Sequence, residues 1–286
     1  MLGHLLFRRL SERGYEVYGT LRNSAAKGLV APNAETCARL FVGVDATDTE
    51  ALLRVLSTLR PDALINCVGI IKQLPAAKDP IPSLTINALL PHRLSLISAT
   101  VGARLIHIST DCVFNGRRGN YQEDDISDAT DLYGRSKFLG EVHAEHAITL
   151  RTSIIGHELG TRHGLVEWYL SQRAPVRGWR RAIYTGFPTT EFCRIVADYI
   201  LPRPELSGLM QVSSDSIDKH SLLSLIKATY HSPVEIIPEE ATAIDRSLDS
   251  RRFRKLTGYN PPSWPELITS MHSDYRACGV YQVLRK

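Results

Sequence analysis

The chain has 286 residues, of which 43% are hydrophobic and 22% are charged, and its formal net charge is +4 at pH 7. These values are typical of a folded globular protein and exclude a disordered, collagen-like or disulfide-scaffold chain. No apolar run approaches the ~20 residues that span a bilayer, and the apolar start breaks at Arg8 and Arg9, so neither a membrane segment nor a signal peptide is expected. The sequence therefore predicts a cytoplasmic protein.

Charge and cysteine usage exclude further classes of partner. The basic residues form no block, so we expect no nucleic-acid partner, and the arginine bias fits either phosphate-bearing small molecules or a solvated surface. The five cysteines are odd in number and never in CxxC spacing, which indicates neither a disulfide framework nor a zinc site. His143 and His146 stand on a helical pattern beside Glu141 and Glu145, but this pair has no third ligand, so we expect no metal.

The first two-thirds of the chain alternates short apolar runs with longer amphipathic segments. This alternation is typical of right-handed βαβ units, so the predicted fold class is α/β, a doubly wound parallel (Rossmann-like) sheet with a smaller C-terminal α+β part. Strands are predicted at residues 15–20, 40–44, 62–68, 104–109 and 148–152, and helices at residues 2–13, 49–59, 83–100 and 133–146.

After Thr152 the alternation loosens and prolines punctuate the chain. We expect a dinucleotide-binding domain over residues 1–153 with 183–212, and a substrate-binding domain over residues 154–182 with 213–286. In this region helices are predicted at residues 165–172, 191–201, 219–230, 250–257 and 265–275, and strands at residues 209–213 and 234–237.

The start of the chain conflicts with this architecture. A doubly wound nucleotide-binding fold opens with a strand, a Gly-rich turn and a helix, whereas here Gly3 runs straight into the first predicted helix, which Gly14 would end as a C-cap. A missing first strand would lie between the strands at 15–20 and 62–68 and leave their backbone groups unpaired. We therefore hypothesise that Met1 is an internal methionine and that the functional chain carries about ten more residues, a strand plus a turn. The intact mass of the native protein tests this.

Tyr133 and Lys137 form a YxxxK pair whose i, i+4 spacing puts both side chains on one face of a helix. With a nicotinamide ribose bound, the ammonium would favour the phenolate and let Tyr133 exchange a proton near neutral pH. Thr110 stands at the carboxyl end of a predicted strand, where ligands bind in such sheets, and would hydrogen-bond the oxygen that Tyr133 protonates. Ser109 is the neighbouring candidate for the role of Thr110. The alternative interpretation of the YxxxK pair is a tyrosine at the start of a helix beside a surface lysine.

Residues 107–141 carry a specific pattern, with STDCVFNG, an acidic loop and YGRSKFLGE in succession. This stretch resembles the extended short-chain dehydrogenase/reductase superfamily and, more narrowly, is similar to the dTDP-4-dehydrorhamnose reductase family. The resemblance extends over nearly the whole chain and includes NCVG at 66–69, GFPTT at 186–190, RSLD at 246–249 and LTGY at 256–259.

The resemblance implies a catalytic triad of Thr110, Tyr133 and Lys137, with Asn87 as a supporting asparagine. The implied reaction is hydride delivery from a nicotinamide to C4 of a 4-keto nucleotide sugar, with Tyr133 protonating the new alkoxide. Lys137 would bind the ribose hydroxyls and lower the pKa of the tyrosine. Substrate contacts are expected at Asp111, Val113, Thr152, Ser153, Thr189, Arg180 and Arg251, with Arg180, Arg181 and Arg251 as candidates for the diphosphate or, alternatively, as solvated charges.

Cofactor contacts are expected at the ends of the first strands. Arg22 follows the strand at 15–20 where an acidic residue would select NAD(H), so we predict NADP(H), with NAD(H) left open. Gly3 would allow close packing at the phosphate-binding turn. Asp45 resembles the adenine-contacting aspartate of the superfamily. Cys67, Val68 and Gly69 would flank the adenine ribose, and Ser109 completes the expected cofactor set.

Two departures from the reductase pattern leave the sugar open. Cys112 replaces an aromatic residue, and residues 70–73 (IIKQ) are apolar and basic where the family is more polar and acidic. The expected partner is a nucleotide-diphosphate sugar, with a homodimer left open. Two alternatives remain. One is an epimerase or a dehydratase of the same superfamily, and the single carboxylate after Thr110 argues against the dehydratase. The other is a non-catalytic module such as the regulatory subunit of methionine adenosyltransferase.

Overall fold

The computed structural model describes residues 1–24, 27–30 and 33–283, which form two compact units. The first unit contains residues 1–109, 136–149 and 193–209, and the second contains residues 110–135, 150–192 and 210–286. This division reflects packing alone, so the assignment of residues 1–153 with 183–212 to a dinucleotide and of the remainder to a substrate stays a prediction. In the described part of the chain, no helix combines the length and the apolar character needed to cross a membrane.

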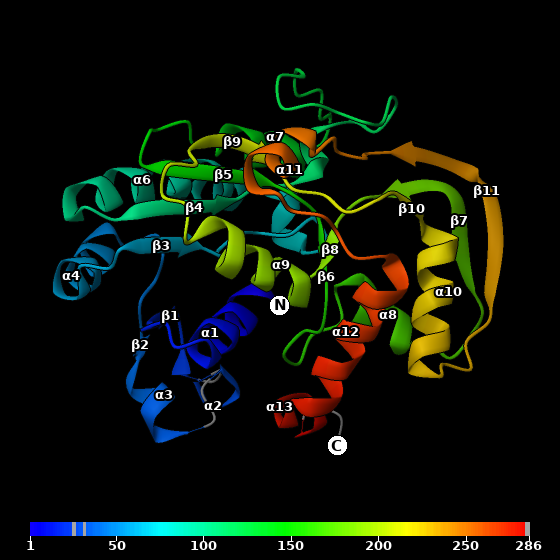
Figure 1. Ribbon diagram of the computed structural model, residues 1–286, viewed down its shortest axis with the longest axis horizontal. Coiled ribbons are helices and arrows are strands. Elements are labelled where there is room, and N and C mark those ends of the chain that lie inside the picture. The colour runs from blue at the N-terminus through cyan, green and yellow to red at the C-terminus, as the bar shows by residue number, and fades with distance from the viewer. Residues whose placement is uncertain (25–26, 31–32, 284–286) are drawn as a thin grey trace. The chain divides into compact units, whose positions relative to one another are not determined.

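A four-stranded sheet organises the first unit. Its strands lie in the order β3 (Ala63–Asn66), β4 (Arg104–Ile108), β5 (Ala147–Arg151) and β9 (Gly208–Gln211), as Figure 1 shows. β3 and β4 pair in parallel, and every residue of β5 is buried, as expected for a strand covered on both faces. The predicted α/β fold with a parallel sheet is therefore confirmed.

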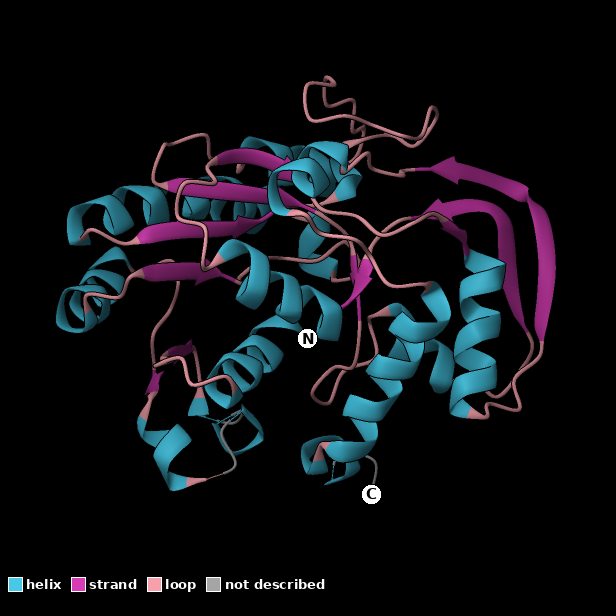
Figure 2. Cartoon of the chain, viewed as in Figure 1, coloured by secondary structure: helices cyan, strands magenta, loops and turns pink. Residues whose placement is uncertain are grey.

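A second, two-stranded sheet of β1 (Gly19–Leu21) and β2 (Leu40–Val42) also belongs to the first unit and is drawn apart from the four strands in Figure 2. Within the described residues, no strand pairs with the outer edge of β1 or of β3. β1 is shorter than the predicted strand at 15–20, because it pairs only along the three residues of β2, which ends at Val42, just before Gly43 (φ 83°).

The first helices of this unit follow the predicted ranges closely. α1 (Leu2–Glu12) ends before Gly14, whose φ of 82° confirms the expected glycine cap. α4 (Thr49–Leu59) begins at the predicted residue because the side chain of Asp48 accepts a hydrogen bond from the backbone of Ala51. Two short helices, α2 (Lys27–Val30) and α3 (Ala34–Ala38), were not predicted.

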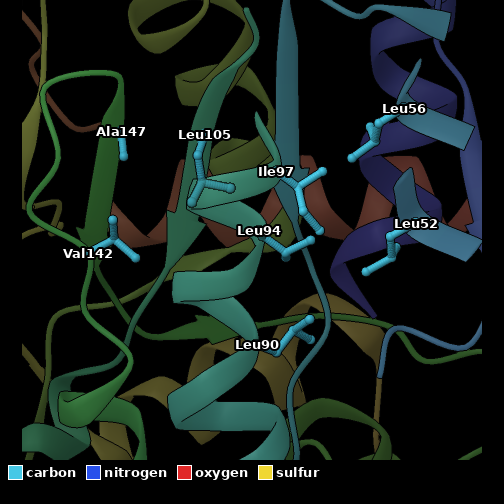
Figure 3. Packing of buried hydrophobic residues seen from close by; sticks show 8 residues of the cluster. All are labelled: Leu52, Leu56, Leu90, Leu94, Ile97, Leu105, Val142 and Ala147. Atoms are coloured by element: carbon cyan, nitrogen blue, oxygen red, sulfur yellow. The ribbon is translucent and has the colours of Figure 1, made fainter. Parts of the chain in front are cut away.

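The hydrophobic core of the first unit forms around α6 (Leu90–Val101). Figure 3 shows Leu90, Leu94 and Ile97 along this helix, between Leu52 and Leu56 of α4 and Leu105 of β4. Each of these side chains is buried, so the amphipathic spacing in the sequence becomes a packed face. This packing fixes the strand from which Ser109 and Thr110 project.

The helix predicted at 83–100 is present, but it is not a regular α-helix, because it contains a π-helical turn. It consists of α5 (Pro80–Ser83), the π-helical turn η3 (Leu84–Leu89) and α6, after the short turn η2 (Pro75–Lys78). Pro91 has no N–H to donate to the carbonyl of Asn87, four residues earlier, so regular α-helical bonding fails there. Instead the Asn87 carbonyl approaches Gly140, where a Cβ atom would lie only 1.9 Å from it.

Helix α7 (Leu132–Leu139) is also shorter than the predicted helix at 133–146. After Gly140 the chain turns away, and the backbone N–H of Val142 donates to the hydroxyl of Thr149 at 3.0 Å, which fixes this segment to β5. His143 and His146 therefore do not lie on a helix with Glu141 and Glu145. The ring of His146 instead hydrogen-bonds Ser95 on α6.

The second unit contains a three-stranded sheet in the order β10 (Ile217–Asp218), β7 (Val176–Tyr184) and β11 (Ile236–Asp245), with α10 (Lys219–Tyr230) against β7. β7 was not predicted and β11 extends well beyond the predicted 234–237, because arginines and glutamates interrupt their apolar patterns.

The remaining elements of the two units are η4 (Asp111–Val113), β6 (Ile154–Ile155), α8 (Leu165–Leu170), β8 (Phe187–Pro188), α9 (Thr189–Ile195), η5 (Val196–Ile200), α11 (Arg251–Thr257), α12 (Trp264–Ala277) and α13 (Gly279–Val283).

Candidate active site

Thr110 lies directly after β4, at the carboxyl end of the strand. Its side chain accepts a hydrogen bond from the backbone of Cys112 at 3.2 Å, which starts the short turn η4. Its hydroxyl also donates to Oδ1 of Asp111 at 3.1 Å. The carboxyl ends of parallel strands are where ligands bind in α/β sheets, so Thr110 lies at the edge suited to chemistry.

Tyr133, the second residue of α7, is hydrogen-bonded through its hydroxyl to Thr110. The close approach requires Gly134, because a Cβ there would lie 2.2 Å from the carbonyl oxygen of Cys112. Burial raises the pKa of Tyr133 above its usual 10.0, the nearby Cys112 and Asp111 raise it further, and the Thr110 hydrogen bond lowers it. The phenol is therefore protonated at neutral pH and can act as a proton donor.

Asp111 is 8% exposed, and burial raises the pKa of its carboxyl group, while the positive charge of Arg246 acts in the opposite direction. The backbone N–H of Asp111 donates to the carbonyl of Thr152 at 3.3 Å, which joins two of the predicted substrate-binding residues. The structure adds Tyr184 of β7, whose pKa is held well above 10.0 by burial and by the charge of Asp111. No local motif marks Tyr184, because only the pairing of β7 places it in this neighbourhood.

Lys137 lies one turn after Tyr133 on α7, as the spacing predicts, and belongs to the first unit. Its Nζ donates to the carbonyl of Ile108 at 2.7 Å, and the residue is only 6% exposed. Burial lowers the pKa of Lys137 to about 8, and the negative charge of Glu141 acts against that fall.

Ser109 and Glu141 form a second contact at the same strand end. The Ser109 hydroxyl donates to Oε1 of Glu141 at 2.7 Å, and both residues are buried. Glu141 was not among the expected site residues. It stands four residues after Lys137 in the YGRSKFLGE stretch, so its spacing is the signal that could have identified it.

Asn87 supports the loop after β3. Its Oδ1 accepts from the backbone N–H of Ile70 at 2.9 Å, its Nδ2 donates to the Ile70 carbonyl at 3.0 Å, and a weaker contact reaches Ser136 of α7 at 3.3 Å. Asn66 holds the other side of this loop by accepting from the backbone of Val68 at 3.0 Å. The two asparagines therefore fix the backbone around Gly69, a predicted cofactor contact.

The predicted cofactor residues lie at strand ends of the first unit. A Cβ on Gly3 would contact Cys67 at 3.4 Å, so the amino end of α1 packs on the residue that follows β3. Arg22, which follows β1, is exposed. The carboxylate of Asp45 accepts hydrogen bonds from the backbone and hydroxyl of Thr47 at 2.8 and 2.7 Å, which lower its pKa together with the charge of Arg22.

The predicted substrate residues are more dispersed. Val113 is fully buried in a hydrophobic cluster of the second unit, and Thr189 is packed against Gly156. Arg180 lies 3.8 Å from Glu240, with 52% of its side chain exposed, and Arg251 pairs with Asp249 and is 78% exposed. The structure therefore links Thr110, Asp111, Thr152 and Tyr133 directly, whereas substrate contacts at the remaining positions, Ser153 included, stay predictions.

The model of one protein family, described as the RmlD substrate binding domain, matches residues 1–167. Among curated proteins the chain is similar to the Bacillus subtilis spore coat polysaccharide biosynthesis protein SpsK (28% identity, 54% of this chain, 50% of that one) and to the Haloferax volcanii probable low-salt glycan biosynthesis reductase Agl14 (31%, 61% and 58%). It therefore spans about half the length of these relatives. A Danio rerio methionine adenosyltransferase 2 subunit beta is 23% identical over 82% of this chain and 72% of its own.

Two solved structures extend the likeness beyond the region of the family model. A hypothetical dTDP-4-dehydrorhamnose reductase from Sulfolobus tokodaii superposes with a TM-score of 0.74 and 25% identity, over 92% of this chain and 94% of that one. A dTDP-4-dehydrorhamnose reductase from Bacillus anthracis, solved in complex with NADP, gives a TM-score of 0.72 and 22% identity, over 90% and 99%. The second likeness shows the fold alone.

Proposed function

The chain belongs to the RmlD substrate binding domain family, and from this membership we propose that it is an oxidoreductase that reduces the 4-keto group of a nucleotide-diphosphate sugar with NADPH. The observation that carries the proposal is the hydrogen bond between Tyr133 and Thr110 at the carboxyl end of β4, with Lys137 one turn further along α7. The likeness to reductase structures and to Agl14 supports the same reaction class.

The first unit has groups that suit a dinucleotide. The amino end of α1 has no side-chain cap, and backbone N–H groups at such an end bind phosphate oxygens. Gly3 lets this end pack closely against Cys67 beside the loop that Asn66 and Asn87 fix. The exposed guanidinium of Arg22 fits a 2′-phosphate, which favours NADPH over NADH.

A bound nicotinamide cofactor supplies the hydride that adds to the carbonyl carbon of the sugar. Tyr133 donates its phenolic proton to the carbonyl oxygen, which becomes a hydroxyl group, and Thr110 orients that oxygen by a hydrogen bond. The ammonium of Lys137 stabilises the phenolate that remains. Burial of Thr110 and Lys137 limits water around the proton transfer and strengthens these electrostatic effects.

NADPH oxidation by the purified protein, against a panel of 4-keto sugars linked to dTDP, UDP or GDP, tests this proposal. The Tyr133→Phe variant should lose about 100-fold or more of kcat, because general acid catalysis contributes 10²–10⁴-fold. The matched control is Tyr199→Phe, since Tyr199 stands beside Ile200, whose carbonyl bonds Arg104 at the opposite, amino end of β4. The proposal would be overturned if no sugar of the panel supports NADPH oxidation, or if the Tyr133→Phe variant is as active as the unmodified protein.

The similarity to a methionine adenosyltransferase 2 subunit beta favours one second candidate, a non-catalytic module that binds NADP(H). Binding of NADPH, measured by fluorescence, without turnover of any sugar would support this candidate. The same panel tests the epimerase alternative, because an epimerase returns a product without net oxidation of NADPH.

A further inference from the structure

The end of β4 and the segment that follows α7 are joined by two polar contacts in the first unit. Lys137 Nζ donates to the carbonyl of Ile108 at 2.7 Å, and the hydroxyl of the next residue, Ser109, donates to Glu141 Oε1 at 2.7 Å. The cation and the carboxylate are therefore both anchored to adjacent residues of one strand end.

Both charged side chains are almost completely buried, since Lys137 is 6% exposed and Glu141 is 4% exposed. A buried ammonium without a nearby negative charge loses its proton readily, because desolvation disfavours the charged form. Glu141 opposes this effect on Lys137. The carboxylate thus has an electrostatic effect in addition to its contact with Ser109.

Glu141 is the charged neighbour that raises the pKa of Lys137, and the neighbouring His107 is neutral. His107 of β4 is 1% exposed, and its Nδ1 lies 3.1 Å from Nδ2 of Asn66. Because Oδ1 of Asn66 accepts from Val68, Nδ2 must be the donor, so Nδ1 of His107 is an acceptor and the ring is neutral. Burial, Lys137 and His92 on α6 all hold the pKa of His107 well below 6.5. Tyr133, one turn earlier on α7, is protonated at neutral pH.

We propose that Glu141 is a positioning residue whose buried carboxylate, oriented by Ser109, keeps Lys137 an ammonium ion in the neutral pH range. The importance of that ammonium for catalysis rests on the proposed reductase function. The electrostatic link itself does not, because it is a property of the free protein. Glu141 itself does not need to touch the substrate.

The pKa of Lys137 can be measured directly in the whole chain by NMR, with lysine labelled at the ε carbon with ¹³C. A Lys137→Arg variant assigns the resonance. In Glu141→Gln the amide oxygen can still accept from Ser109 while the charge is removed, so the pKa of Lys137 should fall by about one pH unit. In Ser109→Ala the charge remains, so the pKa should fall by less than half as much.

Two results would overturn the proposal: an unchanged Lys137 pKa in Glu141→Gln, or equal shifts in both variants, which would indicate a purely packing role for Glu141. If Glu141→Gln does not fold, Glu141→Asp replaces it. That variant keeps the charge but moves it back by one methylene, and it should lower the pKa by a smaller amount, whereas no shift would contradict the proposal.

Activity provides a separate readout. With a sugar that the unmodified protein reduces, the alkaline limb of the kcat profile should move to lower pH in Glu141→Gln by the same amount as the Lys137 pKa. A shift in the NMR titration without any reductase activity would contradict the proposed function but support the electrostatic link. If Glu141→Gln loses activity while the pKa of Lys137 is unchanged, the electrostatic link is overturned and the proposed function is unaffected.

Discussion

Asp111 and Asp249 are both buried aspartates of the second unit, but their surroundings move their pKa values in opposite directions. Burial raises the pKa of Asp111, and the charge of Arg246 compensates only in part. Hydrogen bonds from Arg251, at distances down to 2.5 Å, lower the pKa of Asp249. Ionised Asp111 therefore destabilises the fold, whereas ionised Asp249 stabilises it.

We expect Asp111→Asn to raise the free energy of unfolding at pH 7 by about 1 kcal/mol, and Asp249→Asn to lower it by about 1 kcal/mol, a small value because the exposed Arg251 is screened by water. The gain from Asp111→Asn should vanish as the pH falls below the unfolded pKa near 3.8, since the carboxyl group then becomes neutral in both states. The loss from Asp249→Asn should persist until the pH falls through its lowered folded pKa. Urea denaturation at pH 7 and pH 3.5 measures both, and changes of the same sign at pH 7 would contradict the argument.

At the level of single residues, the sequence predicts contacts that regular geometry fixes and misses those that depend on distant packing. The spacing of Tyr133 and Lys137 follows from one helix, and Thr110 follows from the end of one strand. The effect of Asp111 on Tyr184 could not be predicted, because it depends on the placement of the unpredicted strand β7. The packing of Val113 in a hydrophobic cluster with Leu248 could not be predicted either, because Leu248 is distant in the sequence.

At the level of elements, the packing of the segment after α7 depends on Gly140. Pro91 leaves the carbonyl of Asn87 outside regular helical bonding, and this carbonyl occupies the space where a side chain at position 140 would be. The helix predicted at 83–100 did not reveal the approach of the Asn87 carbonyl to Gly140. A helical apolar pattern fits both a regular α-helix and a helix with a π-helical turn.

Gly140→Ala should therefore lower the free energy of unfolding by about 2 kcal/mol or more, since overpacking against backbone forces the chain to shift. Gly28→Ala is the matched control, because Gly28 lies in the short helix α2 and no atom of the described residues is within 4 Å of an added Cβ. That variant should be neutral or slightly stabilising. Chemical denaturation of both variants tests the expectation, and a Gly140→Ala variant as stable as Gly28→Ala would refute it.

At the level of the whole molecule, neither compact unit is a continuous stretch of chain, and four elements cross the division between the units. α7, β5, α9 and β9 each begin in one unit and end in the other. The predicted domain boundaries missed this interleaving. The alternation of helices and strands indicates the type of sheet, but it does not show which segments pack together into each unit. Regular elements shared in this way couple the stabilities of the units, since melting one unit removes half of each shared element.

We therefore expect the two units to unfold in one cooperative transition. All three tryptophans, Trp168, Trp179 and Trp264, lie in the second unit, whereas the buried Cys193 lies in the first. Tryptophan fluorescence and thiol labelling of Cys193, quantified by mass spectrometry along one urea series, thus report the units separately. Coupled unfolding requires midpoints that agree within about 0.2 M. Labelling of Cys193 well before the fluorescence change would instead show that the first unit opens independently despite the shared elements.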